Sequence, residues 1–275
     1  MAKIGFIGTG NMGGALIFAA CKGIDPKEVV ITDYFPEKAE ELASKLGCRA
    51  AGSNQDVAKE AEYLVLAVKP NVIRGVAQEV APVLQEAAAK GQKKIVVTIA
   101  AGVPIQAVKE CIGSRIPVLR IMPNTPVMVG QGMILISSDD ADPESISEEV
   151  FSEFTDMLKE AGDFERIKES AIDYTTSVSS CAPAFAYMFI EALADGAVQV
   201  GVPRAQALKL AAKTVQGSAA MVLETGEHPG VLKDNVCSPG GSTIVGVTTL
   251  EENGFRSAVS KAVIRSTEKN LSLGK

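Results

Sequence analysis

The sequence predicts an α/β protein in two parts: a doubly wound parallel sheet in residues 1–168 and an all-helical domain in residues 169–275. Two observations predict this fold class. Short, almost uninterrupted apolar runs alternate with helical patterns through the first part, as in a parallel sheet that is covered on both faces. After residue 168, long helical patterns continue but no clear strand pattern does.

Each element is predicted from its own pattern. Apolar, often β-branched runs predict strands at residues 3–8, 29–33, 63–68, 95–99, 117–121 and 133–137, with a last edge strand at 164–167. Amphipathic spacing predicts intervening helices at residues 13–22, 36–46, 72–89, 104–111 and 148–161. The second part is predicted to form helices at residues 169–200, 203–224, 242–252 and 256–271.

The composition limits the classes of function. A chain of 275 residues that is 47% apolar buries a sizeable core, and a net charge of −6 argues against general binding to nucleic acid or anionic membranes. The N-terminus lacks the long apolar core of a signal peptide, and no apolar run approaches the ~20 residues of a membrane span. We therefore expect a soluble, cytoplasmic protein.

The cysteine and histidine content argues against several kinds of site. The five cysteines are odd in number, widely spaced and without a C-x-x-C pair, so we expect free thiols and neither disulfides nor a metal site. The single histidine, His228, precedes Pro229 and Gly230 in a predicted turn. A serine–histidine–aspartate mechanism would depend on that one residue.

Residues Gly8-Thr9-Gly10-Asn11-Met12-Gly13 form the pattern G-x-G-x-x-G between the first strand and the first helix. In a Rossmann dinucleotide-binding domain, Gly8 would allow the tight turn, Gly10 would let the backbone approach the pyrophosphate, and Gly13 would allow close helix–strand packing. The helix N-terminus then offers free N–H groups to the phosphates. A glycine-rich turn without a ligand is the weaker alternative, because strand, motif and helix follow in the required order.

Asp33 ends the second strand, 20 residues after Gly13. An acidic side chain here accepts hydrogen bonds from the adenosine ribose in NAD-type sites, and it repels a 2′-phosphate. No arginine follows closely, so we expect NADH to be used at least as well as NADPH. A cap on the helix that begins at Pro36, or a loop acid, is the alternative.

Three further strand ends are candidate cofactor contacts, because ligands of open α/β sheets bind beyond the carboxyl ends of the strands. The candidates are Ala67, Val68, Lys69 and Pro70 after one strand, Ala100 and Gly102 after the next, and Asn124 after the following one. Lys69 is either a phosphate or substrate contact or a solvated loop lysine. Asn124 either holds the nicotinamide carboxamide or forms an Asn-Thr-Pro turn.

Residues 232–243 are the most unusual segment of the second part. They end in Ser238-Pro239-Gly240-Gly241-Ser242-Thr243 and lead straight into a predicted helix. Two glycines at a helix start expose backbone N–H groups, which suits a small carboxylate. A helix start capped by Ser242 or Thr243 explains the same pattern, and the residue types alone leave both open.

The chain resembles the pyrroline-5-carboxylate reductase family over nearly its whole length. The resemblance is carried by residues 6–12, 67–70, 120–126, 191–196 and 234–243, of which the last stretch is highly specific. It implies a Rossmann domain, a helical dimerisation domain, and active sites shared between the subunits of a homodimer or higher homo-oligomer. The implied reaction is hydride transfer from NADPH or NADH to the cyclic imine 1-pyrroline-5-carboxylate, which gives L-proline in the last step of proline biosynthesis.

The resemblance also implies roles for single residues. It places the substrate at Val236, Ser238, Gly240, Gly241, Ser242 and Thr243. Thr243, the catalytic candidate, would hydrogen-bond the ring nitrogen and position or relay the proton. Asn54 matches a family position near the adenosine ribose, whereas Cys181 and Phe185 depart from the family pattern and their roles stay open.

Two other functions fit the N-terminal pattern. β-Hydroxyacid dehydrogenases and related imine reductases normally carry a lysine on the first long helix of the second domain, and residues 177–195 contain none. A non-catalytic dinucleotide sensor would leave residues 234–243 without a role. The alanine-rich helices after residue 168 are too few to bury their apolar faces alone, which predicts at least a dimer.

Overall fold

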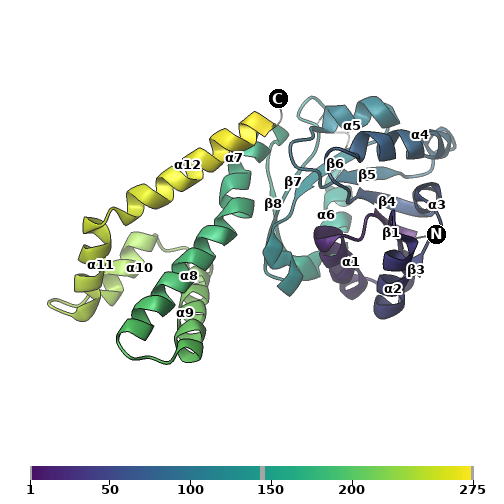
Figure 1. Cartoon of the computed structure of the whole chain (residues 1–275). Coiled ribbons are helices and arrows are strands. Elements are labelled where there is room, and N and C mark those ends of the chain that lie inside the picture. The colour runs from purple at the N-terminus through teal and green to yellow at the C-terminus, as the bar shows by residue number, and fades with distance from the viewer. Residues whose placement is uncertain (1, 143–145, 274–275) are drawn as a thin grey trace. The chain divides into compact units, whose positions relative to one another are not determined.

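The computed structural model describes residues 2–142 and 146–273. The chain divides into two compact units, Met1–Ser180 with Thr267–Lys275, and Cys181–Ser266. The first holds an eight-stranded sheet, and the second is helical (Figure 1). The predicted α/β fold class is confirmed. The first compact unit extends past the predicted boundary at residue 168 to Ser180, because Ile172 is fully buried against Met122 and Leu135 of the sheet.

The sheet has the strand order of a dinucleotide-binding fold over most of its width. The order is β3-β2-β1-β4-β5-β6-β7-β8. The strands are β1 (Ala2–Ile7), β2 (Val29–Thr32), β3 (Arg49–Ala50), β4 (Ala61–Leu66), β5 (Ile95–Thr98), β6 (Val118–Met122), β7 (Gly132–Ser137) and β8 (Gly162–Arg166). The winding reverses between β1 and β4, which is where a crevice for a ligand opens at the carboxyl ends of the strands.

One edge of the sheet departs from the all-parallel prediction. β7 runs antiparallel to β6, and β8 then pairs parallel to β7. Only residues 123–131 separate β6 from β7, and a parallel pair needs a crossover of a dozen or more residues. The short strand β3 and the helix after it were also not predicted, because residues 49–60 show neither a long apolar run nor a long amphipathic period.

The helices cover both faces of the sheet. They are α1 (Asn11–Gly23), α2 (Pro36–Leu46), α3 (Asn54–Glu60), α4 (Ile73–Ala89), α5 (Ile105–Ile112), α6 (Glu148–Met157) and α7 (Ile172–Thr176). One apolar cluster joins the sheet to α1, α2 and α6, and a second joins it to α3, α4 and α5. Within β4, Tyr63 and Val65 belong to the first cluster and Leu64 and Leu66 to the second. Strands buried on both faces explain their continuous apolar runs.

The second unit is built from α8 (Ala182–Gln199), α9 (Arg204–Thr225), α10 (Pro229–Val236), α11 (Ser242–Glu252) and most of α12 (Phe255–Leu273). Its buried cluster contains only Ala194, Ala207 and Ala211, with partly buried neighbours such as Ile190. Helix α10 corrects the predicted turn around His228: the Nδ1 atom of His228 accepts a hydrogen bond from the Gly230 N–H (3.0 Å) and caps this helix.

One helical stretch corrects the expectation that no segment reaches the length of a membrane span. Glu169–Gln199, 31 residues long, is long and apolar enough by length and composition, and only 6% of its most apolar window is buried. The expectation was based on uninterrupted apolar runs, whereas this stretch reaches the threshold as an average. An exposed apolar helix also serves for packing against another protein surface, so length and composition alone are weak evidence for a membrane span.

Candidate nucleotide and substrate sites

The turn between β1 and α1 needs glycine at two positions for different reasons. Gly8 has a φ of +106°, and a Cβ atom on it would lie 2.4 Å from the carbonyl oxygen of Ala67. A Cβ on Gly13 would lie 2.4 Å from the carbonyl oxygen of Gly8. At Gly10, in contrast, a Cβ would meet nothing within 4 Å. Gly8 and Gly13 are therefore required by the fold. Gly10 leaves open space where the pyrophosphate is predicted to approach the protein backbone.

Helix α1 presents its N-terminus to that space. Its N-cap is Gly10, which has no side chain to satisfy the first N–H groups, and the first turn contains no acidic residue. The N–H groups of the first turn, at Asn11, Met12 and Gly13, are therefore available to an anion, and the helix dipole favours a negative charge there. This is the arrangement expected for a pyrophosphate.

A cavity of about 1100 Å³ lies over this turn and the neighbouring strand ends. It is lined by twelve of the predicted cofactor residues: Gly8, Gly10, Asn11, Met12, Gly13, Asp33, Asn54, Ala67, Val68, Lys69, Pro70 and Ala100. Sequence reasoning missed several other lining residues, among them Tyr34, Val72, Val76, Glu79 and Met128. Most of these lie in helices or loops that carry no motif, so only the packing of α4 and of residues 122–128 reveals them.

Asp33 lies at the cavity, but much of its hydrogen-bonding capacity is used by the protein. Its Oδ2 atom accepts hydrogen bonds from the Thr9 N–H (2.7 Å) and the Thr9 hydroxyl (2.8 Å), and Oδ1 accepts one from the Phe35 N–H (3.1 Å). Partial burial raises the pKa of Asp33, but these hydrogen bonds outweigh it, and the net effect is a pKa below the ordinary value. The carboxylate therefore stays charged at neutral pH and holds the glycine-rich turn against the end of β2.

Two predicted cofactor residues do not line the cavity. Gly102 has a φ of +73° and serves the turn after β5, where Ala100 and Ala101 face the cavity instead. Asn124 is 7% exposed; its Nδ2 atom donates to the Ser179 carbonyl (2.8 Å), and its Oδ1 atom accepts from the Met133 N–H (3.1 Å). Because both ends of this amide are bonded to protein, the alternative of a structural turn residue fits Asn124 better than a nicotinamide contact.

The Asn124 contact has a local cause in the sequence. Residue 183 is proline, which has no N–H to donate to the carbonyl four residues earlier, at Ser179. The chain forms a π-helical segment at Ser177–Cys181, and the Asn124 side chain supplies the missing donor. In the same segment, the buried Ser177 hydroxyl accepts hydrogen bonds from Thr267 (2.8 Å) and Asn270 (3.3 Å) of α12.

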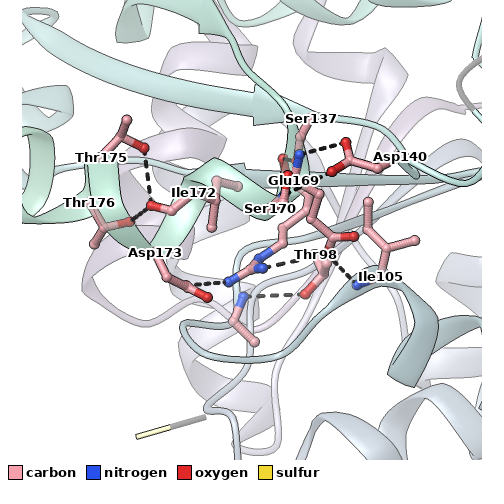
Figure 2. A network of polar contacts seen from close by, with 12 residues as sticks. Thr98, Ile105, Ser137, Asp140, Glu169, Ser170, Ile172, Asp173, Thr175 and Thr176 are labelled. Carbon is pink, nitrogen blue, oxygen red and sulfur yellow. Dashed lines mark hydrogen bonds and ion pairs between the residues drawn. The ribbon is translucent and has the colours of Figure 1, made fainter. Parts of the chain in front are cut away.

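A polar network holds the chain that follows β8 against the sheet (Figure 2). The guanidinium of Arg120, 3% exposed, pairs with Glu169 (3.4 Å) and Asp173 (2.9 Å). Glu169 also accepts a hydrogen bond from the Ile105 N–H (2.6 Å), and its burial raises its pKa. The Nε atom of Arg120 is buried and has no partner among the described residues. The network specifies where residues 169–173 lie but adds no group to the cavity.

The substrate-site candidates of the helical unit come together at the start of α11. Gly240 has a φ of +67°, the Gly241 N–H donates to the Ser238 carbonyl (3.0 Å), and a Cβ on Gly241 would lie 2.4 Å from the Ser238 hydroxyl. The N-cap of α11 is Gly241, with no side-chain cap. Ser242 and Thr243 are thus the first helical residues and not the cap, so the capped-start alternative does not hold. Val236 ends α10 beside this turn.

Comparison with known proteins agrees with both parts of this arrangement. Residues 169–273 match the family model described as pyrroline-5-carboxylate reductase dimerisation, and residues 3–102 match one described as NADP oxidoreductase, coenzyme F420-dependent. The pyrroline-5-carboxylate reductase of Escherichia coli is 42% identical over 275 residues, which cover 99% of this chain and 98% of that one. The chain belongs to the pyrroline-5-carboxylate reductase family. The predicted family is confirmed.

The structure of this chain is similar to solved structures of the same family. The pyrroline-5-carboxylate reductase of Coxiella burnetii has a TM-score of 0.90 at 28% identity, covering 100% of this chain and 99% of that one. The Plasmodium falciparum enzyme, solved with NADP bound, has a TM-score of 0.84 at 31% identity and covers 100% and 98%. An imine reductase from Myxococcus stipitatus shares the fold alone, at 19% identity and a TM-score of 0.51. The N-terminal part is therefore a nicotinamide dinucleotide-binding domain, and the C-terminal part supports homo-oligomerisation.

Proposed function

We propose that the protein reduces 1-pyrroline-5-carboxylate to L-proline with a hydride from NADH or NADPH. The observation that carries this proposal is the uncapped start of α11, where Gly240 and Gly241 lead into Ser242 and Thr243. The substrate is a small carboxylate with a ring nitrogen. A helix N-terminus with unbonded N–H groups suits the carboxylate, and a hydroxyl beside it suits the nitrogen.

The residues of the N-terminal cavity fit a nicotinamide dinucleotide. Gly10 leaves room for a pyrophosphate against the backbone, and α1 offers the N–H groups of its first turn. Such a cofactor supplies the hydride, and the protein supplies orientation and electrostatics. Ala67, Val68, Lys69 and Pro70 after β4, with Ala100 after β5, line the rest of this binding surface.

The proposed reaction does not require a strongly acidic or basic side chain. A cyclic imine accepts hydride readily once its nitrogen is protonated, so the reaction in this direction needs positioning more than a strong base. Thr243 positions the ring nitrogen through its hydroxyl, while the backbone N–H groups of Ser242 and Thr243, at the uncapped start of α11, hold the carboxylate. The single histidine is bonded as a helix cap, and this mechanism does not require it.

The finer properties follow from the same residues. The charged Asp33 at the cavity disfavours a 2′-phosphate, so NADH is used at least as well as NADPH. The exposed apolar side chains of the helical unit are covered in a homodimer or higher homo-oligomer whose subunits share active sites, as the family resemblance implies. The location is cytoplasmic.

One assay tests the function directly. The purified protein is incubated with NADH or NADPH and 1-pyrroline-5-carboxylate, and cofactor oxidation is followed together with proline formation. Stoichiometric proline is expected with both cofactors. Cofactor binding without turnover would identify a dinucleotide sensor, and turnover of other cyclic imines but not of this carboxylate would identify an imine reductase of another specificity.

A further inference from the structure

Two cavity residues from separate helices are hydrogen-bonded to each other. Asn54 begins α3 and Glu79 lies in α4, and the Nδ2 atom of Asn54 donates to Oε2 of Glu79 at 2.7 Å. Both residues line the large cavity. Glu79 carries no sequence motif, and its contact with Asn54 exists only because α3 and α4 pack on the same face of the sheet.

The pair lies at the end of the cavity that contains Asp33. Asp33 directly follows β2, and Asn54 follows β3, which pairs with β2 at the edge of the sheet. The carboxyl ends of neighbouring parallel strands lie side by side. In a fold of this type, the acidic residue after the second strand marks the ribose of the adenosine half of the cofactor.

The carboxylate of Glu79 decides which way the amide of Asn54 faces. A carboxylate only accepts hydrogen bonds, so the NH₂ group must point to Glu79. The carbonyl oxygen Oδ1 is then left for a ligand, since no protein donor to it is found among residues 2–142 and 146–273. With the amide reversed, two oxygen acceptors would face each other and the NH₂ group would face the cavity.

The remaining capacity of Asp33 points to the same kind of ligand group. Its Oδ2 atom accepts two hydrogen bonds from Thr9, and its Oδ1 atom accepts one from Phe35, which leaves a single lone pair on Oδ1. Oxygen acceptors on Asp33, Asn54 and Glu79 thus remain for a ligand. Ribose hydroxyls donate to such atoms, whereas a 2′-phosphate has no proton to donate when fully ionised and is repelled by two carboxylates.

We propose that Glu79 is a specificity-determining positioning residue, which holds the Asn54 carbonyl toward the cofactor and so favours the ribose hydroxyls of NADH over the 2′-phosphate of NADPH. This inference rests on the proposed use of NADH or NADPH. It assigns part of the discrimination to a residue that acts through Asn54, in addition to the charge of Asp33.

The test is a double-mutant cycle on the full-length protein. Dissociation constants for NADH and NADPH are measured by fluorescence titration for the parent, Glu79→Gln, Asn54→Ala and the double variant. In Glu79→Gln the new amide pairs with Asn54 either as acceptor or as donor, so the orientation with the NH₂ group of Asn54 toward the cavity becomes available. The affinity for NADPH relative to NADH should rise roughly three- to tenfold, the size of one net hydrogen bond. Glu86→Gln, on the same helix but paired with Lys90 outside the cavity, should leave the ratio unchanged.

The cycle separates orientation from charge. If Glu79 acts through Asn54, the change in the NADPH-to-NADH ratio falls to within about twofold when Asn54 is already alanine. The same change in both backgrounds would show that Glu79 acts by its charge alone, and a parent protein that strongly prefers NADPH would also overturn the inference. A parent that binds neither cofactor would instead overturn the proposed function.

Discussion

The two units of this chain differ in how much of their apolar surface is buried. In the sheet unit, the strand and helix side chains form two large clusters in which most members are fully buried. In residues 181–266, only Ala194, Ala207 and Ala211 are buried, while large side chains such as Met188 and Leu223 are 69% and 78% exposed. One unit completes its core within the chain. The other has a surface that requires another surface to cover it.

The functional residues divide in the same way. The cofactor-site candidates lie on the unit that completes its core within the chain, and the substrate-site candidates lie on the unit that does not. Cofactor binding should therefore survive changes that disrupt assembly, while turnover should not. Each prediction below compares the two units, from the largest expected effect to the smallest.

Charging the exposed face of α9 should have the largest effect. Leu210 and Met221, 54% and 50% exposed, lie eleven residues apart and so on one face of that helix. The double change Leu210→Asp with Met221→Asp would bury two unpaired charges in an assembled interface. We expect a shift to monomer in light scattering and at least a hundredfold loss of turnover, roughly the cost of breaking an interface core.

The control for this change lies in the sheet unit. Val129 is 75% exposed there, and Val129→Asp should alter neither the oligomeric state nor turnover. NADH binding should be retained in all of these variants. An unchanged oligomer in the double variant would show that this face of α9 is not an interface.

Removing the Thr243 hydroxyl should come next. Thr243→Val keeps the shape of the side chain, and we expect turnover to fall about 10²-fold with NADH affinity unchanged. Thr248→Val is the matched control, because that hydroxyl is bonded to the Ile244 carbonyl (2.9 Å) of the same helix. Rates within twofold of the parent for Thr243→Val would assign catalysis to cofactor placement alone.

A methyl group at Gly10 should separate binding from folding in the sheet unit. Gly10→Ala adds a Cβ in open space, so the thermal midpoint should not fall, but the affinity for NADH should drop about tenfold or more because the pyrophosphate cannot approach the backbone. Gly13→Ala, which would clash with the Gly8 carbonyl, should destabilise the protein. Equal NADH affinity in Gly10→Ala would argue against a pyrophosphate at this turn.

A buried and an exposed amide give a direct comparison of the units. Asn124→Ala removes the part-buried hydrogen bonds to the Ser179 carbonyl and from the Met133 N–H, at a cost of about 1–3 kcal/mol and several degrees in the thermal midpoint. Asn253→Ala removes an exposed bond to the Thr249 carbonyl in the helical unit and should change the midpoint little. Similar losses would mean that Ser179 finds another donor.

The smallest effect is expected from a surface carboxylate of the sheet unit. Burial raises the pKa of Glu153, but hydrogen bonds from Lys3, Lys93 and Tyr63 lower it to about 2. A depressed pKa stabilises the fold above the unfolded value near 4.3, and this contribution disappears as the pH falls toward 2. Glu153→Gln should lower the thermal midpoint slightly at pH 7 and less at pH 3, within about 1 kcal/mol. A difference that does not shrink on acidification would assign the effect to packing.

The sequence alone was sufficient to predict the features that depend on local patterns of residues. Strand and helix patterns and the G-x-G-x-x-G turn depend on neighbouring residues, so local propensity and spacing predict them. The substrate role of residues 234–243 is implied by the family resemblance instead. Twelve of the fourteen cofactor candidates line the cavity, among them Asn54, which the family resemblance implied. The two that do not, Gly102 and Asn124, lie at the predicted strand ends, but a strand end does not determine which way its loop turns.

Only the tertiary structure decided which partners distant residues find. Three contacts join residues that no local pattern connects. They are the antiparallel pairing of β7 with β6, the hydrogen bond from Asn124 to the Ser179 carbonyl, and the hydrogen bond from Asn54 to Glu79. The position of Asp33 after the second strand makes it predictable as a charge at the cavity. Its hydrogen bonds are not predictable in the same way, because they are short-range and directional. Which of its lone pairs remain for a ligand is known only once Thr9 and Phe35 are folded against it.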